Sequence, residues 1–269
     1  MNKIRQPAVA GMFYPDNQHE LRAQIDGFLA EAKSDYAAPK ALIAPHAGYI
    51  YSGPVAASAY ATIRDQKNTI NRVVLLGPAH RVFVQGVAAS SAERFRTPLG
   101  DVEIDQACIR ELVDRFSFVN IADDAHAEEH SLEVHLPFLQ RTLDDFILVP
   151  LAVGDASREE IDFVLESLWG GLETLIVISS DLSHYHDYAT AQRLDRATSS
   201  AIEHLQPERI QYEDACGRIP IIGLLQTAKH RGLVATNIDL RNSGDTTGPR
   251  DQVVGYGAFL FYESSESNT

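Results

Sequence analysis

Short apolar runs alternate along the chain with segments in which apolar residues recur every three or four positions. The first pattern predicts buried strands and the second predicts amphipathic helices. The predicted strands are residues 41–45, 72–78, 146–153 and 174–180, and the predicted helices are residues 20–32, 55–63, 106–116, 158–169 and 191–205. This alternation predicts an α/β fold with a central, largely parallel sheet and helices on both faces.

Two regions depart from this alternation. Residues 84–104 show a period of two around the turn-like TPLGD and predict a β-hairpin inserted between a strand and the next helix. Residues 233–244 and 253–263 predict two consecutive strands, joined by SGDTTGPRD and antiparallel at one edge of the sheet. We expect a single domain over residues 1–269, with a frayed polar tail at residues 264–269.

Composition and charge narrow the choice of function. The 269 residues are 45% hydrophobic and 22% charged, as in ordinary globular proteins, and the net charge of −14 disfavours nucleic acid and anionic membrane surfaces. No apolar segment approaches the roughly 18 residues that cross a bilayer, and the GxGxxG and P-loop patterns are absent. Two cysteines in a chain of this length predict a reducing compartment, the cytoplasm by default.

Histidines follow three of the predicted strands. His46 follows residues 41–45 and His80 follows residues 72–78. Residues 174–180 are followed by Asp181, His184 and His186. A histidine after one strand is usually a loop residue or a hydrogen-bonded core residue. The carboxyl ends of parallel strands lie along one edge of a sheet, where ligands bind, so three such histidines together predict a functional site.

The segment EEHSLEVHLPF, residues 128–138, is the second candidate. On a helix, His130 and Glu133 share a face, whereas His135 points elsewhere. One interpretation is a solvated helix start with Glu128 and Ser131 near its cap. The other makes His130 and Glu133 contacts to substrate or groups that orient a metal-bound imidazole.

The third candidate is DACGRIPIIGLLQTAKHRG, residues 214–232, where the apolar spacing predicts a helix starting near residues 218–220. Cys216 then precedes a helix N-terminus beside Arg218, and both influences favour a thiolate. The alternative is that Cys216 is a small buried residue. Cys108 lies within a predicted helix and is interpreted as a small core residue.

Seven blocks of the sequence together resemble the Memo family across nearly the whole chain: PAVAGMFYP (7–15), APHAGYIYSGPVAASAY (44–60), LLGPAH (75–80), TPLGD (97–101), EEHSLEVHLPFLQ (128–140), SSDLSHY (179–185) and DACGRIPI (214–221). This resemblance implies a fold similar to the class III extradiol, LigB-like, ring-cleaving dioxygenases. It also implies one bound metal ion near the mouth of the sheet, with iron(II) favoured and copper or zinc as alternatives.

By motif, the metal ligands of the Memo family fall on His46 of PHAGY, His80 of GPAH and Cys216 of CGRIPI. His184 resembles the acid or base residue of the dioxygenases, and Asp181 would orient a neighbouring group. A thiolate where the dioxygenases have a carboxylate is softer and more easily oxidised, which changes the preferred metal and the redox behaviour.

The leading hypothesis is therefore a cytoplasmic metal-binding protein with a dioxygenase-like, possible oxidoreductase site for an unknown small molecule. His184 and Asp181 are its candidate catalytic residues, and His130, Glu133 and Arg218 its candidate substrate contacts. The resemblance also implies a radical-SAM or signalling partner. One alternative is a binding module or signalling adaptor for a short peptide or small ligand. Another is a hydrolase with Cys216 as nucleophile, His184 or His46 as base and Asp181 as orienting group.

Overall fold

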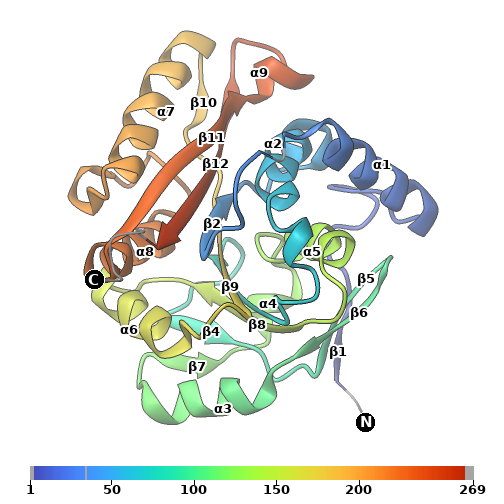
Figure 1. Ribbon diagram of the computed structural model, residues 1–269, viewed down its shortest axis with the longest axis vertical. Coiled ribbons are helices and arrows are strands. Elements are labelled where there is room, and N and C mark those ends of the chain that lie inside the picture. Colours follow the sequence, from blue (N-terminus) through green and yellow to red (C-terminus); the bar gives the residue numbers. More distant parts are fainter. Residues whose placement is uncertain (1–2, 34, 264–269) are drawn as a thin grey trace.

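A mixed sheet of twelve strands runs through the computed structural model, which describes residues 3–33 and 35–263 (Figure 1). The strand order is β1-β5-β6-β8-β3-β9-β2-β12-β10, with β11 paired to β12 and β4 paired to β7 and β8. The strands are β1 (Ile4–Arg5), β2 (Ala41–Ala44), β3 (Arg72–Pro78), β4 (Val87–Ala89), β5 (Arg94–Thr97), β6 (Gly100–Ile104), β7 (Val119–Ile121), β8 (Ile147–Val153), β9 (Thr174–Ser179), β10 (His184–His186), β11 (Leu233–Asn242) and β12 (Val253–Glu263).

The four strands predicted from continuous apolar runs form the parallel centre of the sheet. β8, β3, β9 and β2 lie side by side in that order, and each neighbouring pair is parallel. All six residues of β9 and all four of β2 are buried. Strands covered on both faces read as unbroken apolar runs, which is why the sequence reveals them clearly.

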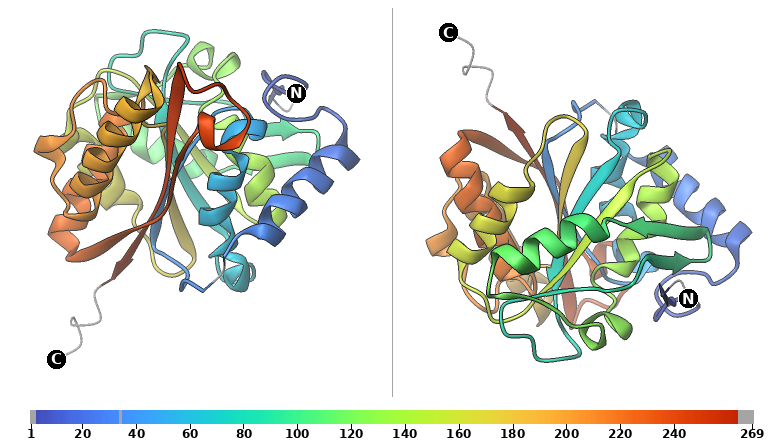
Figure 2. Two further views of the ribbon diagram at one scale, coloured as in Figure 1. Left: turned by 90° about the horizontal axis from the view of Figure 1, so that it is seen from above. Right: turned by 90° about the horizontal axis from the view of Figure 1, so that it is seen from below.

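Helices cover both faces of this sheet, as predicted (Figure 2). α1, α2 and α5 pack together on one side, α6 packs on α8 across the other, and α7 lies against β11 and β12. The helices are α1 (Gln18–Glu31), α2 (Tyr49–Ala61), α3 (Gln106–Arg115), α4 (Asp124–Ala127), α5 (Leu136–Thr142), α6 (Arg158–Leu168), α7 (Tyr188–Glu203), α8 (Arg218–Arg231) and α9 (Ser243–Thr246), with 3-10 turns η1 (Arg64–Gln66), η2 (Glu133–His135) and η3 (Pro207–Arg209).

The two predicted antiparallel regions exist with changed boundaries. The hairpin consists of β5 and β6 around the turn at Pro98, whereas β4 belongs to the main sheet through its antiparallel pairing with β8. β11 and β12 are antiparallel as predicted. Of these two strands, however, only β11 lies at an edge, because β12 also pairs with β2.

The continuous helix on which both interpretations of residues 128–138 depend does not form. α4 ends at Ala127, residues 128–132 are not helical, and η2 and α5 follow. The backbone N–H groups of His130 and Ser131, which a continuous helix would use, donate to the side chain of Glu129 instead, each at 2.9 Å. A carboxylate that captures local backbone donors competes with helix formation in this way.

Two further expectations concern the ends of the chain and the membrane. The frayed tail expected at residues 264–269 lies outside the described residues. Within the described ranges, none of the helices combines the length and the apolar character that crossing a bilayer requires.

Candidate metal centre

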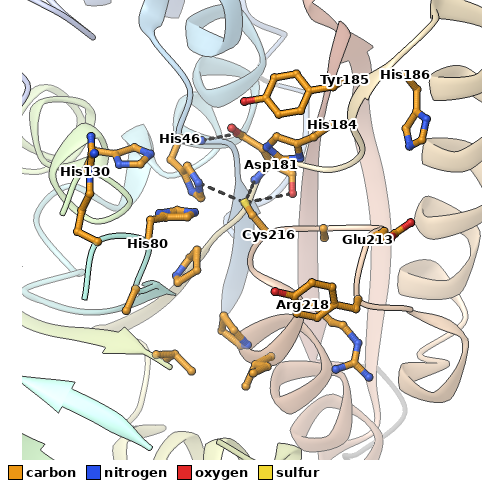
Figure 3. A pocket seen from close by; sticks show the side chains of 18 residues that line it. His46, His80, His130, Asp181, His184, Tyr185, His186, Glu213, Cys216 and Arg218 are labelled. Carbon is orange, nitrogen blue, oxygen red and sulfur yellow. Dashed lines mark hydrogen bonds between the residues drawn. The ribbon is translucent and has the colours of Figure 1, made fainter. Parts of the chain in front are cut away.

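The carboxyl ends of three parallel strands open into one pocket with a cavity volume of about 800 Å³ (Figure 3). β2 leads into His46, β3 into His80, and β9 into Asp181, and all three side chains line the pocket. Cys216 reaches the same pocket from the loop before α8, and His130 from the non-helical loop after α4. The structure thus brings together residues that are as far apart as positions 46 and 216.

The orientation of the His46 ring is fixed by its Nδ1 atom. Nδ1 lies 2.6 Å from Ser179 Oγ, and that hydroxyl donates to the carbonyl oxygen of Ser131 at 2.6 Å. Because the serine proton is used on the carbonyl, Nδ1 must carry the proton that it donates to Ser179. Burial, followed by the nearby imidazoles, holds the pKa of His46 well below its ordinary value. His46 is therefore neutral, and its Nε2 carries the lone pair that faces the Cys216 thiol.

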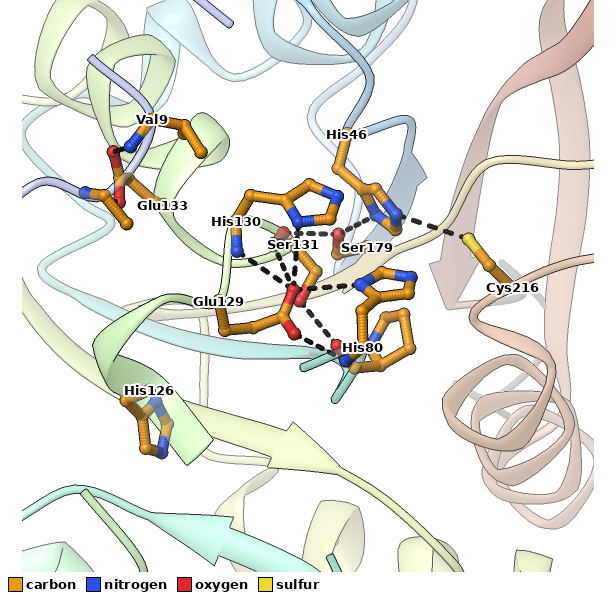
Figure 4. Close-up of polar contacts among 12 residues, drawn as sticks. Val9, His46, His80, His126, Glu129, His130, Ser131, Glu133, Ser179 and Cys216 are labelled. Atoms are coloured by element: carbon orange, nitrogen blue, oxygen red, sulfur yellow. Dashed lines mark hydrogen bonds and ion pairs between the residues drawn. The ribbon is translucent and has the colours of Figure 1, made fainter. Parts of the chain in front are cut away.

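His80 is oriented in the same way, by Glu129 (Figure 4). The Glu129 carboxylate accepts the His80 Nδ1 proton at 2.9 Å and the His80 backbone N–H at 2.5 Å. Burial acts to raise the pKa of Glu129, but these bonds and that from the Ser131 amide outweigh it and hold the pKa at about 2. A carboxylate on Nδ1 fixes the imidazole tautomer and raises the basicity of Nε2, as is common beside metal ligands.

His130 completes a group of three imidazoles. Its ring stacks on that of His80, with centroids 4.7 Å apart, and its centroid lies 5.4 Å from that of His46. One ring nitrogen from each of His46, His80 and His130 lies within 4.8 Å of the other two. Burial lowers the pKa of His130 to about 4, so this ring, like that of His46, can offer a neutral nitrogen donor. This group could hold a metal ion.

Cys216 lies at the side of this group. Its Sγ is 3.3 Å from His46 Nε2 and 3.3 Å from the backbone N of Asp181. The expectation of a thiolate favoured by the start of α8 and by Arg218 is wrong for the metal-free protein. Burial, and then the charge of Asp181, raises the pKa of Cys216 to about 12. Cys108 is buried, as expected.

Asp181 and His184, the predicted catalytic pair, both line the pocket. The buried Asp181 Oδ1 accepts the backbone N–H of His46 at 2.8 Å, and burial raises its pKa. Asp181 therefore positions the loop that carries His46. His184 is followed by Tyr185, which is 72% exposed and has a φ of 61°, a conformation that a non-glycine residue adopts at a cost.

The three predicted substrate contacts separate. His130 and Arg218 line the pocket, although Arg218 Nε donates to the carbonyl of Ile210 at 2.9 Å. Glu133 is buried away from the pocket, where it accepts hydrogen bonds from the backbone of Ala8 and Val9. His130 and Glu133 do not share a helical face, because the helix expected there is broken.

The sequence analysis named His186, which lines the pocket, but missed Glu129, Ser179 and the pocket-lining Tyr185. Glu129 stands directly before His130 and was available as a signal. On a continuous helix, however, the residue that shares a face with His130 is Glu133, so Glu129 was not paired with it. Ser179 lies at the end of an apolar strand, and its role depends on a contact with His46 that the sequence does not show.

A largely parallel sheet that presents imidazoles, a thiol and carboxylates to one pocket defines an α/β protein with a histidine-rich candidate metal site. The comparisons with known proteins give the family. The sequence profile of Memo, described as Memo-like protein, matches residues 5–260. The chain belongs to the Memo family, which confirms the resemblance seen in the sequence.

Curated relatives match nearly the whole length of the chain. A MEMO1 family protein of Aquifex aeolicus is 38% identical, over 96% of this chain and 99% of its own. MEMO1 family proteins of Saccharolobus solfataricus and Methanocaldococcus jannaschii are each 34% identical, over 96% and 97% of this chain and 99% of theirs. The crystal structure of an uncharacterized Escherichia coli K12 protein has a TM-score of 0.50 and 13% identity, over 82% of this chain and 98% of that one, which supports the fold class alone.

Proposed function

We propose that the protein binds one transition-metal ion through His46, His80 and Cys216 and uses it in redox chemistry on a small molecule. The observation that carries this proposal is the arrangement of the two imidazoles. Each commits its Nδ1 atom to a hydrogen bond, His46 to Ser179 and His80 to Glu129, which leaves Nε2 as the nitrogen that can bind a metal. Metal sites commonly fix imidazole ligands in this manner. His46 Nε2 already lies 3.3 Å from the Sγ of Cys216, the third proposed ligand.

The donor set fits a metal of intermediate softness. Two neutral imidazoles and one thiolate suit iron, copper or zinc, and iron(II) is favoured because the family resemblance implies a dioxygenase-like site. Cys216 in its metal-free form holds a proton, which metal binding would release. His130 is a geometric alternative to Cys216 as the third ligand, because it satisfies the mutual spacing with His46 and His80.

A bound iron or copper ion would supply the electron transfer or Lewis acidity that the side chains lack. The residues of the chain would bind and orient the substrate and handle protons. His184 faces the pocket as the group that can hold or deliver a proton, and Asp181 keeps the His46 loop in place. The cavity is large enough for a small organic molecule or the end of a short peptide.

The test is elemental analysis of protein purified without oxygen. We expect about one metal ion per chain, as one coordination sphere implies, and its loss in His46→Gln and Cys216→Ser. Matched controls are Cys108→Ser, the other cysteine, and His19→Gln, an exposed histidine, both of which should retain the metal. Unchanged metal content in both site variants would rule out these ligands, and loss in His130→Gln but not in Cys216→Ser would assign the third ligand to His130.

A hydrolase without metal is the second candidate, because the 3.3 Å contact between Cys216 Sγ and His46 Nε2 also suits a thiol nucleophile and its base. A chelator distinguishes the two candidates, and alkylation tests the hydrolase directly. A chelator should abolish turnover by the metal centre and leave the hydrolase active. Alkylation of Cys216 in metal-free protein should abolish hydrolysis.

A further inference from the structure

The N-terminal segment, residues 4–14, packs against the loop that carries Glu129 and His130. It contains most of the block PAVAGMFYP. Residues 7–15, all of which the structure describes, do not line the pocket. The contacts of this segment nevertheless lead to the histidine group, through three steps.

The first step is the side chain of Arg5 in β1. Its guanidinium is almost fully buried, with 6% of the side chain exposed, and all of its three nitrogens are used. Nε donates to the carbonyl of His126 at 3.0 Å, one terminal nitrogen donates to the carbonyl of Glu129 at 2.6 Å, and the other forms an ion pair with Glu133. A single planar group thus holds three points of the segment 126–133.

The second step is the carboxylate of Glu133, which returns the contact to the N-terminal segment (Figure 4). It accepts the backbone N–H of Ala8 at 2.7 Å and of Val9 at 3.0 Å, and the hydroxyl of Tyr14 at 2.5 Å. Every partner that the described structure gives this buried anion comes from residues 5–14. The two segments are therefore held together by direct contacts.

The third step is Phe13, which touches both histidine loops. Its ring centroid lies 4.9 Å from that of His130. Its carbonyl accepts the N–H of Tyr49, at 2.8 Å, and Tyr49 begins α2 three residues after His46. The same short segment thus fixes the backbone on either side of the imidazole group.

We propose that Arg5 is a positioning residue for the metal centre, an inference that rests on the proposed function. By fixing the carbonyls of His126 and Glu129, its guanidinium sets where the Glu129 carboxylate meets His80 Nδ1. The N-terminal segment thus holds the loop of Glu129 and His130 in place, and the block PAVAGMFYP supports metal binding without supplying a ligand.

The experiment compares Arg5→Lys and Arg5→Met with Arg141→Met. Arg141 forms an ion pair with Asp26 through two of its nitrogens, at 2.9 and 3.0 Å, away from the pocket. Arg5→Lys keeps the charge beside Glu133 but lacks the planar fork that reaches two carbonyls as well, and it is the variant more certain to fold. Zinc affinity is measured by competition with a chelator, and the His80 tautomer by ¹⁵N NMR of the metal-free protein.

We expect zinc binding to weaken about 10-fold to 100-fold in both Arg5 variants, the range found when groups that support metal ligands are changed. We also expect His80 to lose its single Nδ1–H form, while Arg141→Met matches the wild type in both readouts. If folded Arg5→Lys binds zinc normally and keeps the His80 tautomer, the proposal is overturned and Arg5 is only structural. If wild-type protein binds no zinc, iron or copper, the proposed function fails, and the NMR measurement still decides the role of Arg5.

Discussion

His135 offers a quantitative test of how burial controls the histidines of this protein. The residue is 1% exposed, and its Nδ1 lies 2.8 Å from the hydroxyl of Tyr60. Its Nε2 has no hydrogen-bond partner in the described structure. We consider the substitution His135→Leu, which removes the titratable group and keeps a side chain of similar size.

The magnitude follows from the pKa of His135, which burial lowers from 6.5 to about 3. Between these values the unfolded chain binds a proton that the folded chain does not, so the stability of the wild type falls as the pH decreases below 6.5. At pH 5, which is about 1.5 units below the ordinary pKa of 6.5, protonation stabilises the unfolded chain by about 1.36 kcal/mol for each of these units. His135 therefore costs the wild type about 2 kcal/mol at pH 5 relative to pH 8.

The assay is urea unfolding of both proteins at pH 8 and pH 5. At pH 8 the variant should be the less stable one, because the buried hydroxyl of Tyr60 loses its partner, at a cost of about 1–3 kcal/mol. At pH 5 the difference should shift by about 2 kcal/mol in favour of the variant. His19→Leu, at an exposed position, is the matched control. Parallel pH dependences of wild type and His135→Leu would refute the reasoning.

Three further changes at the pocket, and one control substitution away from it, give additional tests. Gly217→Ala would place Cβ 2.5 Å from the carbonyl oxygen of Ser179, so urea unfolding should show a loss of about 1–3 kcal/mol. Gly27→Ala, in α1 with open space around it, should instead stabilise by about 0.5–1 kcal/mol, and equal effects at the two sites would contradict this. Glu129→Gln should weaken zinc binding about 10-fold to 100-fold in chelator competition. Because its lowered pKa makes Glu129 stabilise the folded wild type above about pH 4.5, this contribution is lost as the pH falls to about 2. Glu129→Gln should not show this loss in acid titrations. Removing a metal present at 100 times its Kd should cost about 2.7 kcal/mol in thermal or urea unfolding, and an unchanged midpoint would show that the metal does not bind the folded state preferentially.

The centre of the fold could be predicted because its signal is local. β3 and β9 are buried on both faces, so almost every residue in them is apolar. The start of α8 at Arg218 is likewise visible in the spacing of apolar residues and in Pro220. Short elements such as β1 and β10 have two and three residues, too few for a periodic pattern to appear.

The candidate site was only partly predictable, because several of its properties depend on distant residues. The meeting of His46 and His80 follows from strand topology, which the apolar pattern indicates. The protonated state of Cys216 depends on burial and on the charge of Asp181, which lie outside its own segment. The broken helix before His130 results from Glu129 binding backbone donors, including the amide of His80, 49 positions earlier.

The position of β2 in the sheet has a consequence for how the protein folds. Its neighbours are β9 and β12, so among the described residues this strand has no pairing partner before Thr174. During synthesis, the apolar segment from Ala41 to Ala44 therefore stays unpaired until β9 and β12 have been made. Such delayed long-range pairing slows folding and exposes an aggregation-prone strand, so this segment is where we expect chaperones to bind the nascent chain.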